Sequence, residues 1–161
     1  LFKQRLNSLS SGELIEADQL GGDFVWEEVK INSSGNSYKR LFIAGGIGIT
    51  PYLSMVRDLI FRRQPINVTL LYAGKHEKRP FMEELHNAIK IDPTLIIKDY
   101  SENRLTLEQL KKDVPDIEQF VVYLAGSQVF SEALGEGLVA KGFPRQQIKY
   151  DYFDGYADLE Y

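Results

Sequence analysis

Short apolar segments alternate with amphipathic segments along most of the chain. Five strands are predicted, at residues 41–44, 68–72, 95–98, 120–124 and 147–150. The first, second and fourth are continuous apolar runs rich in β-branched and aromatic residues. That pattern is typical of strands buried on both faces of a parallel sheet.

The segments between these strands predict helices. After Pro51, a favourable first helical residue, apolar side chains from Tyr52 to Ile60 recur at three- and four-residue steps. The same spacing recurs at residues 81–89, 107–110 and 130–138, and Gly142 ends the last of these helices. Alternating strands and helices predict right-handed crossovers and an α/β fold, a doubly wound five-stranded parallel sheet of the Rossmann-like kind.

Residues 1–38 do not continue this alternation. They predict a short helix, then two strands at residues 13–17 and 24–31 joined by a turn at 19–23. The polar stretch 32–37 has the composition of a linker, so we expect one domain at 1–38 and another at 39–161. Because the chain opens with Leu1 inside an amphipathic run, without the features of a signal peptide, we expect it to be part of a longer protein.

Composition narrows the functional classes. The net charge of -4 and the pI near 5.3 argue against a nucleic-acid-binding surface, because phosphate binding needs a basic face. No apolar stretch approaches the ~20 residues of a membrane-spanning helix, so no membrane segment is expected in this chain. The lack of cysteine excludes disulfides and thiol chemistry and favours a reducing compartment, so we expect the chain in the cytoplasm or in the cytosolic domain of a membrane-bound protein. His76 and His86 have no third partner at ligand-like spacing, and no metal site is predicted.

The first candidate site follows the first strand, where three glycines lead into a helix begun by Thr50 and Pro51. Glycines let a phosphate approach the backbone amides, and a helix amino terminus adds N–H donors. Thr50 either caps this helix or turns its hydroxyl toward a ligand. Because Pro51 stands where the common Gly-x-Gly-x-x-Gly fingerprint has its third glycine, a purely structural turn stays the alternative to dinucleotide binding. A Walker-type loop is excluded, since no Gly-Lys-Ser/Thr follows.

Two further turns follow later strands. The second strand ends at Tyr72, before a small-residue turn with the basic residues Lys75, Lys78 and Arg79. In a doubly wound sheet this cluster would lie where a ribose 2′-phosphate binds, although a solvated basic turn balanced by nearby glutamates is an equally good interpretation. The fourth strand breaks at Gly126 into a helix, and two glycine turns flanking one crevice make a stronger case than either alone.

Together these stretches resemble the ferredoxin–NADP reductase superfamily, which includes flavodoxin reductases, cytochrome b5 reductases and the reductases of oxygenase systems. The family pattern runs from a Gly-Gly-x-Gly-x-Thr-Pro turn, through a strand ending in Tyr, a Glu-Leu and a Cys-Gly-Pro turn, to an acidic-x-Phe-x-Gly-Tyr segment. The corresponding segments here are residues 45–51, Tyr72 with Glu84 and Leu85, residues 125–127 and residues 151–156. Their order and spacing agree with the family over residues 39–156.

Three positions depart from the family pattern and affect the expected placement of the nicotinamide. Ala125 stands in place of the frequent cysteine, Ser127 in place of the following proline, and Asp151 in place of the usual glutamate.

The resemblance implies that NAD(P)H lies across the carboxyl edge of the sheet, with its pyrophosphate on residues 45–48, and passes a hydride to FAD. Thr50 and Gly126 would border the nicotinamide, while Phe153, Tyr156 or Tyr161 would cover the flavin unless they only close the last strand onto the core. Residues 1–38 resemble the end of the family's flavin-binding β-barrel. The expected catalytic residues are Thr50, Asp151 and Phe153. The expected cofactor-binding residues are Gly45, Gly46, Gly48, Thr50, Pro51, Tyr72, Lys75, Arg79, Arg104, Gly126, Ser127 and Tyr156.

The resemblance leaves alternatives open. Lys75, Arg79 and Arg104 favour NADPH slightly over NADH, although no Ser-Arg pair follows the second strand. Electrons would pass from FAD to a ferredoxin, a flavodoxin, a haem domain or ferric iron, and the chain alone is expected to be inactive without a flavin. The alternative function is a nucleotide-binding sensor or electron-transfer subunit without its own turnover. An S-adenosylmethionine methyltransferase is disfavoured, because Thr50, Pro51 and the carboxyl-terminal aromatic residues would have no role in it.

Overall fold

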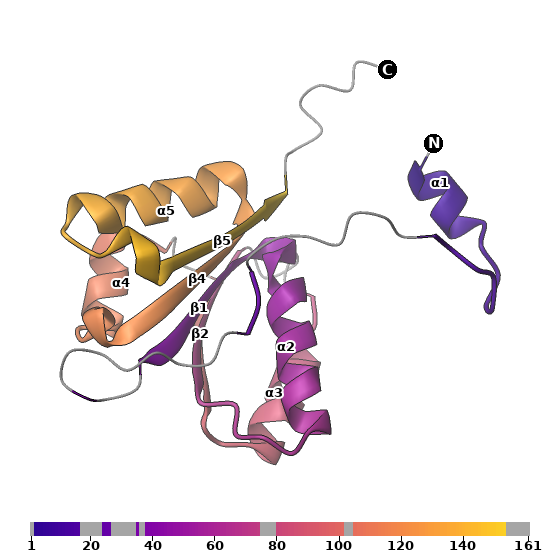
Figure 1. Ribbon diagram of the computed structural model, residues 1–161, viewed down its shortest axis with the longest axis horizontal. Helices are drawn as coiled ribbons and strands as arrows, with labels where there is room; N and C mark the ends of the chain where they lie inside the picture. Colours follow the sequence, from indigo (N-terminus) through magenta and orange to yellow (C-terminus); the bar gives the residue numbers. More distant parts are fainter. Residues whose placement is uncertain are drawn as a thin grey trace.

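The computed structural model describes residues 2–16, 24–26, 35, 38–74, 80–101 and 105–153. Its centre is a five-stranded parallel sheet in the order β3-β2-β1-β4-β5 (Figure 1). The strands are β1 (Lys39–Gly45), β2 (Val68–Ala73), β3 (Leu95–Tyr100), β4 (Phe120–Ser127) and β5 (Ile148–Phe153). The doubly wound α/β fold predicted from the sequence is confirmed.

Burial on both faces explains why the inner strands have continuous apolar sequences. Most residues of β1, β2 and β4 are buried, since each of these strands has a neighbour on either side and helices above and below. The edge strand β3 is less covered, and its Ile96 is exposed.

Helices cover both faces of the sheet (Figure 1). The pair α2 (Thr50–Phe61) and α3 (Met82–Ile91) lies on one face, and the pair α4 (Leu107–Asp113) and α5 (Gln128–Ala140) on the other. Phe42 packs in the apolar cluster under α2 and α3, and its neighbour Ile43 packs in the cluster under α4 and α5, because successive strand side chains point to opposite faces. In the part of the chain that the structure describes, no helix is long and apolar enough to span a membrane.

The connections beside the sheet contain short 3-10 helices. They are η1 (Gly46–Ile49), η3 (Ile117–Gln119) and η4 (Arg145–Gln147). The first of them follows β1 directly and leads without a break into α2.

The amino-terminal part differs from its prediction. The expected short helix is α1 (Phe2–Asn7), but residues 13–16 and 24–26 form no strand, so the strands predicted at 13–17 and 24–31 are wrong over these described residues. A strand needs a neighbour to complete its hydrogen-bonded ladder, and the five-stranded sheet includes neither segment. The remaining residues of that prediction, 17–23 and 27–31, lie outside the described part of the chain.

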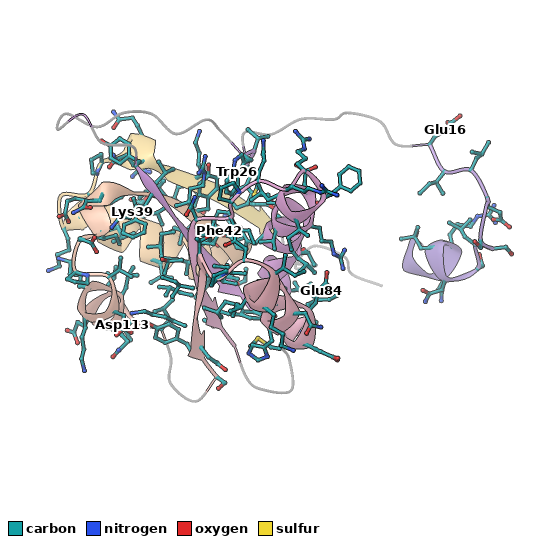
Figure 2. The ribbon with its side chains drawn as sticks, turned by 90° about the horizontal axis from the view of Figure 1, so that it is seen from below. Glu16, Trp26, Lys39, Phe42, Glu84 and Asp113 are labelled. Atoms are coloured by element: carbon teal, nitrogen blue, oxygen red, sulfur yellow. The ribbon has the colours of Figure 1, made fainter. Side chains whose placement is uncertain are left out.

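Instead, two aromatic residues of this part pack on the α2–α3 face of the sheet. The Phe24 ring lies 5.3 Å from that of Tyr123, and the Trp26 ring lies 6.1 Å from that of Phe42. The Arg40 guanidinium lies 3.8 Å from the centroid of the Trp26 ring. Figure 2 shows Trp26 beside Phe42, above the sheet. This segment therefore completes the core beside α2.

Candidate functional site

The candidate site lies at the carboxyl edge of the sheet, between the parallel strands β1 and β4, where the order in which strands are added to the sheet reverses. From β1 the chain continues into α2 on one face, and from β4 it continues into α5 on the other. In open α/β sheets, such a switch point leaves a crevice in which ligands bind. The first predicted glycine turn begins where β1 ends, at Gly45. The predicted break of the fourth strand at Gly126 is wrong, because β4 continues to Ser127 by pairing with β5, and α5 begins at Gln128. The second glycine turn is therefore the junction of β4 and α5 at residues 126–127.

Gly48 is a glycine because its turn packs directly on the end of β4. A Cβ added at Gly48 would lie 2.3 Å from the carbonyl oxygen of Ala125 and 2.5 Å from the amide nitrogen of Gly126. Gly48 therefore brings the two turns into contact.

Gly45 and Gly126 share a different neighbour, the ring of Phe130 in the first turn of α5. A Cβ at Gly45 would lie 2.8 Å from this ring, and a Cβ at Gly126 would lie 3.0 Å from it. The same Cβ of Gly126 would also be 3.2 Å from the Gly45 carbonyl oxygen. Phe130 therefore fills the space where side chains at these two positions would go.

Gly46 is the glycine of this turn that faces open space. Its φ is +54°, in the left-handed region that favours glycine. Among the described residues beyond its own turn, no atom lies within 4 Å of the position of its missing Cβ. Such a surface, with backbone exposed and no side chain in the way, fits a phosphate group at the start of a helix. The residues present thus fit the pyrophosphate of a dinucleotide.

The polar residues of the two turns, Thr50 and Ser127, both form hydrogen bonds within the protein. Thr50 does not cap α2: Ile49 holds the capping position, while the Thr50 hydroxyl donates to the Ile47 carbonyl oxygen at 3.1 Å. The chain has already formed the η1 turn here, so Thr50 is the first residue of the helix rather than its cap. Ser127 caps α5, where its hydroxyl oxygen accepts a hydrogen bond from the Phe130 amide at 3.3 Å.

Tyr72 is placed where its side chain cannot reach a ligand in this conformation. It is fully buried beneath α3, and its hydroxyl donates to the Pro80 carbonyl oxygen at 3.1 Å. This hydrogen bond ties the end of β2 to Pro80, which follows the turn predicted to bind the ribose.

The last strand places Asp151 at the same edge as the glycine turns. Asp151 is aligned with Ala125 in the sheet, and the backbone of Phe153 is aligned with Ser127. The other predicted site residues lie outside the described part of the chain: Lys75, Arg79, Arg104 and Tyr156, together with Tyr161.

Sequence reasoning placed Tyr52 only on the core face of α2, but its hydroxyl lies at the switch point. The hydroxyl is 2.7 Å from the Tyr123 carbonyl oxygen and 3.1 Å from the Ile43 carbonyl oxygen. Burial, and to a smaller extent the nearby Asp151 carboxylate, raises the pKa of Tyr52 well above its ordinary value. Tyr52 is therefore a neutral hydrogen-bond donor.

A groove lies at the opposite, amino edge of the sheet. This groove of about 600 Å³ is lined by residues that include Lys39, Asn67, Thr94, Lys98 and Asp116. Lys39 pairs with Asp116 at 3.2 Å across its rim. Parallel sheets bind ligands at their carboxyl edge, so the groove is not the expected dinucleotide site. The described residues contain no group of three or more His, Asp or Glu side chains that could hold a metal ion.

Comparison with known proteins identifies the family. The sequence pattern of the oxidoreductase NAD-binding domain matches residues 42–135, a region that includes the first glycine turn, β2 and the second glycine turn. Flavohemoprotein A of Dictyostelium discoideum is 26% identical over 147 residues, covering 88% of this chain and 36% of that protein. The flavohemoprotein of Candida albicans is 27% identical over 168 residues, covering 93% of this chain and 39% of that protein. The chain thus spans well under half the length of these relatives.

Solved structures show the same fold. The cytochrome b5 reductase domain of Ulva prolifera nitrate reductase aligns with a TM-score of 0.70 at 21% identity, covering 94% of this chain and 64% of that chain. The flavohem-like FAD/NAD-binding domain of nitric oxide dioxygenase from Vibrio cholerae O1 biovar El Tor aligns with a TM-score of 0.65 at 24% identity. That alignment covers 83% of this chain and 55% of that chain.

Proposed function

The chain belongs to the oxidoreductase NAD-binding domain family, and on that premise we propose that it binds NAD(P)H for a flavin-dependent reductase. The observation that carries the proposal is the pair of glycine turns in contact at the switch point, with Gly46 alone among their glycines open to a ligand. The pyrophosphate lies against Gly46 and the start of α2. The nicotinamide lies between Thr50 and Gly126, with Asp151 on the adjacent strand.

The residues of this chain act by positioning. When bound, the nicotinamide supplies a hydride and a flavin accepts it, so the redox chemistry belongs to the cofactors. Gly46 allows the phosphates to approach the backbone, Thr50 and Gly126 border the nicotinamide, and Phe153 covers the flavin ring. Asp151 places a carboxylate beside the same position.

Three further parts of the proposal concern residues 1–38, the electron acceptor and the location of the protein. Residues 1–38 are the end of a flavin-binding domain, as the resemblance to the ferredoxin–NADP reductase superfamily implies, and their Phe24 and Trp26 are the contact of this segment with the sheet. The names of the relatives join a flavin to a haem protein, which favours a haem domain over ferredoxin, flavodoxin or ferric iron as the electron acceptor. The absence of cysteine supports a cytoplasmic location.

Calorimetric titration of the chain with NAD+ and NADP+ at low salt tests the proposal. We expect at least one of them to bind with a Kd of about 1 mM or tighter. We expect Gly46→Val to abolish this binding, because the new side chain blocks the approach of the phosphates. Gly142→Val is the matched control: Gly142 also has a positive φ, +90°, and open space around it, but it follows the far end of α5. Unchanged affinity in Gly46→Val would contradict the placement.

The preference for NADPH rests on three basic residues, Lys75, Arg79 and Arg104. A ribose 2′-phosphate pairs with Lys or Arg side chains, and these residues follow the second and third strands, next to the expected ribose position. In the same titration, the Lys75→Glu/Arg104→Glu variant should lose affinity for NADP+ and keep its affinity for NAD+. A variant that binds both nucleotides as before would remove this argument.

A further inference from the structure

Tyr52 is a fully buried tyrosine in the first turn of α2, and its hydroxyl reaches two strands at once. The acceptors within hydrogen-bonding distance are the carbonyl oxygens of Ile43, in β1 at 3.1 Å, and Tyr123, in β4 at 2.7 Å. A hydroxyl has a single proton to donate, so the shorter distance makes the Tyr123 carbonyl oxygen its main acceptor. The hydroxyl therefore anchors the start of α2 to the paired strands β1 and β4.

The linked positions lie directly beneath the two glycine turns. Ile43 comes two residues before Gly45, and Tyr123 comes three residues before Gly126. The pairing of β1 with β4 continues to Ala44 and Ala125, after which β1 leads to α2 on one face and β4 leads to α5 on the other. A bond from α2 back to these strands holds the turn between β1 and α2 against the end of β4.

The ring of Tyr52 is held in place from two sides. It stacks on Phe42 with ring centroids 4.4 Å apart and an interplanar angle of 23°. Phe24 lies 5.5 Å away in a tilted arrangement. A ring fixed in this way can hold its hydroxyl at one position.

We propose that Tyr52 is a positioning residue for the dinucleotide: its hydroxyl anchors the start of α2 to β1 and β4 and so sets the spacing between the glycine turns that hold the pyrophosphate and the nicotinamide. The effect on affinity rests on the proposed function, whereas the effect on the spacing of the turns does not. Tyr52 touches no part of the ligand itself.

The experiment compares Tyr52→Phe with Tyr72→Phe. Both variants remove a single hydroxyl that donates to a backbone carbonyl from a fully buried tyrosine on the same face of the sheet, but the Tyr72 hydroxyl bonds Pro80, away from the switch point. Three quantities are measured for each variant: the free energy of unfolding, hydrogen exchange at the amides of Gly46, Gly48 and Gly126, and the Kd for NADP+ and NAD+.

We expect Tyr52→Phe to accelerate exchange at these three glycines and to weaken nucleotide binding, each by about tenfold. Tyr72→Phe should leave exchange at the glycines and affinity within about twofold, at a similar loss of stability. Equal exchange in the two variants would overturn the proposal, and so would faster exchange with unchanged affinity. If Tyr52→Phe fails to fold while Tyr72→Phe folds, Tyr52 serves stability alone and the proposal is also wrong.

The two proposals fail in different ways. If the unaltered chain binds neither NAD+ nor NADP+, the proposed function fails, while the exchange measurement still decides whether Tyr52 couples the turns.

Discussion

Gly48 and Gly46 belong to one turn, yet side chains at these two positions would have different consequences. A methyl group at Gly48 would meet the backbone of Ala125 at 2.3 Å, and backbone cannot move aside cheaply. A methyl group at Gly46 would meet nothing, and the only cost would be its left-handed backbone. The first position serves the fold, and the second is the one that we propose for the ligand.

We therefore predict that Gly48→Ala lowers the free energy of unfolding by about 3 kcal/mol or more, because the clash forces η1 away from β4. Gly46→Ala should cost only about 1–2 kcal/mol, the strain of a left-handed residue with a side chain. Denaturant unfolding of both variants measures the difference. A Gly48→Ala variant as stable as Gly46→Ala would show that η1 does not pack on β4 as described.

At the scale of elements, Asp113 joins α4 to the edge strand β3. Its carboxylate accepts hydrogen bonds from the Tyr100 hydroxyl and, at 2.9 Å, from the Gln109 side chain. The hydrogen bond from Tyr100, followed by that from Gln109, lowers the pKa of Asp113, whereas burial and then the bond to Asp113 raise the pKa of Tyr100. The lowered pKa of Asp113 therefore affects stability in acid, and the raised pKa of Tyr100 affects stability in alkali.

The lowered pKa of Asp113 predicts a loss of stability in acid. Its stabilising contribution is fully present above the unfolded pKa of about 3.9 and disappears as the pH falls through the lower folded value. Tyr100→Phe removes the main cause of the shift, so the free energy of unfolding should fall less steeply below about pH 4 in this variant. Glu108→Gln, on the exposed side of α4, is the control and should keep the steeper fall. Identical acid profiles for Tyr100→Phe and the unaltered chain would contradict the coupling.

Tyr100 predicts the opposite dependence in alkali. Because the pKa of Tyr100 is raised in the folded state, its stabilising contribution is fully present below the unfolded pKa of about 10. This contribution is lost as the pH rises above that value toward the folded pKa. Unfolding experiments between pH 8 and pH 11, a range of about 3 units around the ordinary tyrosine pKa, should show a decline that Tyr100→Phe reduces. A decline of equal size in Tyr100→Phe and the unaltered chain would show that Tyr100 does not cause the loss of stability in alkali.

The sequence located the strands and helices of the sheet domain because their signals are local. Continuous apolar runs mark β1, β2 and β4, and three- and four-residue spacing marks α2 and α5. The carboxyl ends of the strands were predicted too short. The residues Ala125 and Gly126 have little strand preference, and they extend β4 because β1 and β5 lie alongside to pair with them.

The site was only partly predictable for a similar reason. The glycine turns were visible as sequence motifs, but the separate roles of Gly46 and Gly48 depend on the distant Ala125. Likewise, Tyr52 carries the same apolar signal as any other core residue of α2, and its bond to Tyr123 spans 71 residues. Contacts of this kind appear only when the sheet is assembled.

At the scale of the whole molecule, the segment 24–26 packs against the sheet far from its own position in the sequence. Phe24 is half-buried against Tyr52 and Tyr123, whereas the neighbouring Val25 is exposed. We predict that Phe24→Ala lowers the free energy of unfolding by about 1–3 kcal/mol, since it empties part of this contact. Val25→Ala is the matched control and should change stability by less than about 0.5 kcal/mol. Equal effects in denaturant unfolding would show that the segment does not pack on the sheet.

The central claim is that a nicotinamide dinucleotide binds at the carboxyl edge of the sheet, between β1 and β4. Two-dimensional amide NMR spectra recorded during titration with NADP+ and with NAD+ test it most directly. We predict that the amide signals of four residues at the glycine turns shift with nucleotide concentration: Gly46, Ile47, Gly126 and Ser127. The amide signals of Asn67, Thr94 and Lys98, in the amino-edge groove, should stay unchanged. Shifts confined to that groove, or no shifts with either nucleotide, would contradict it.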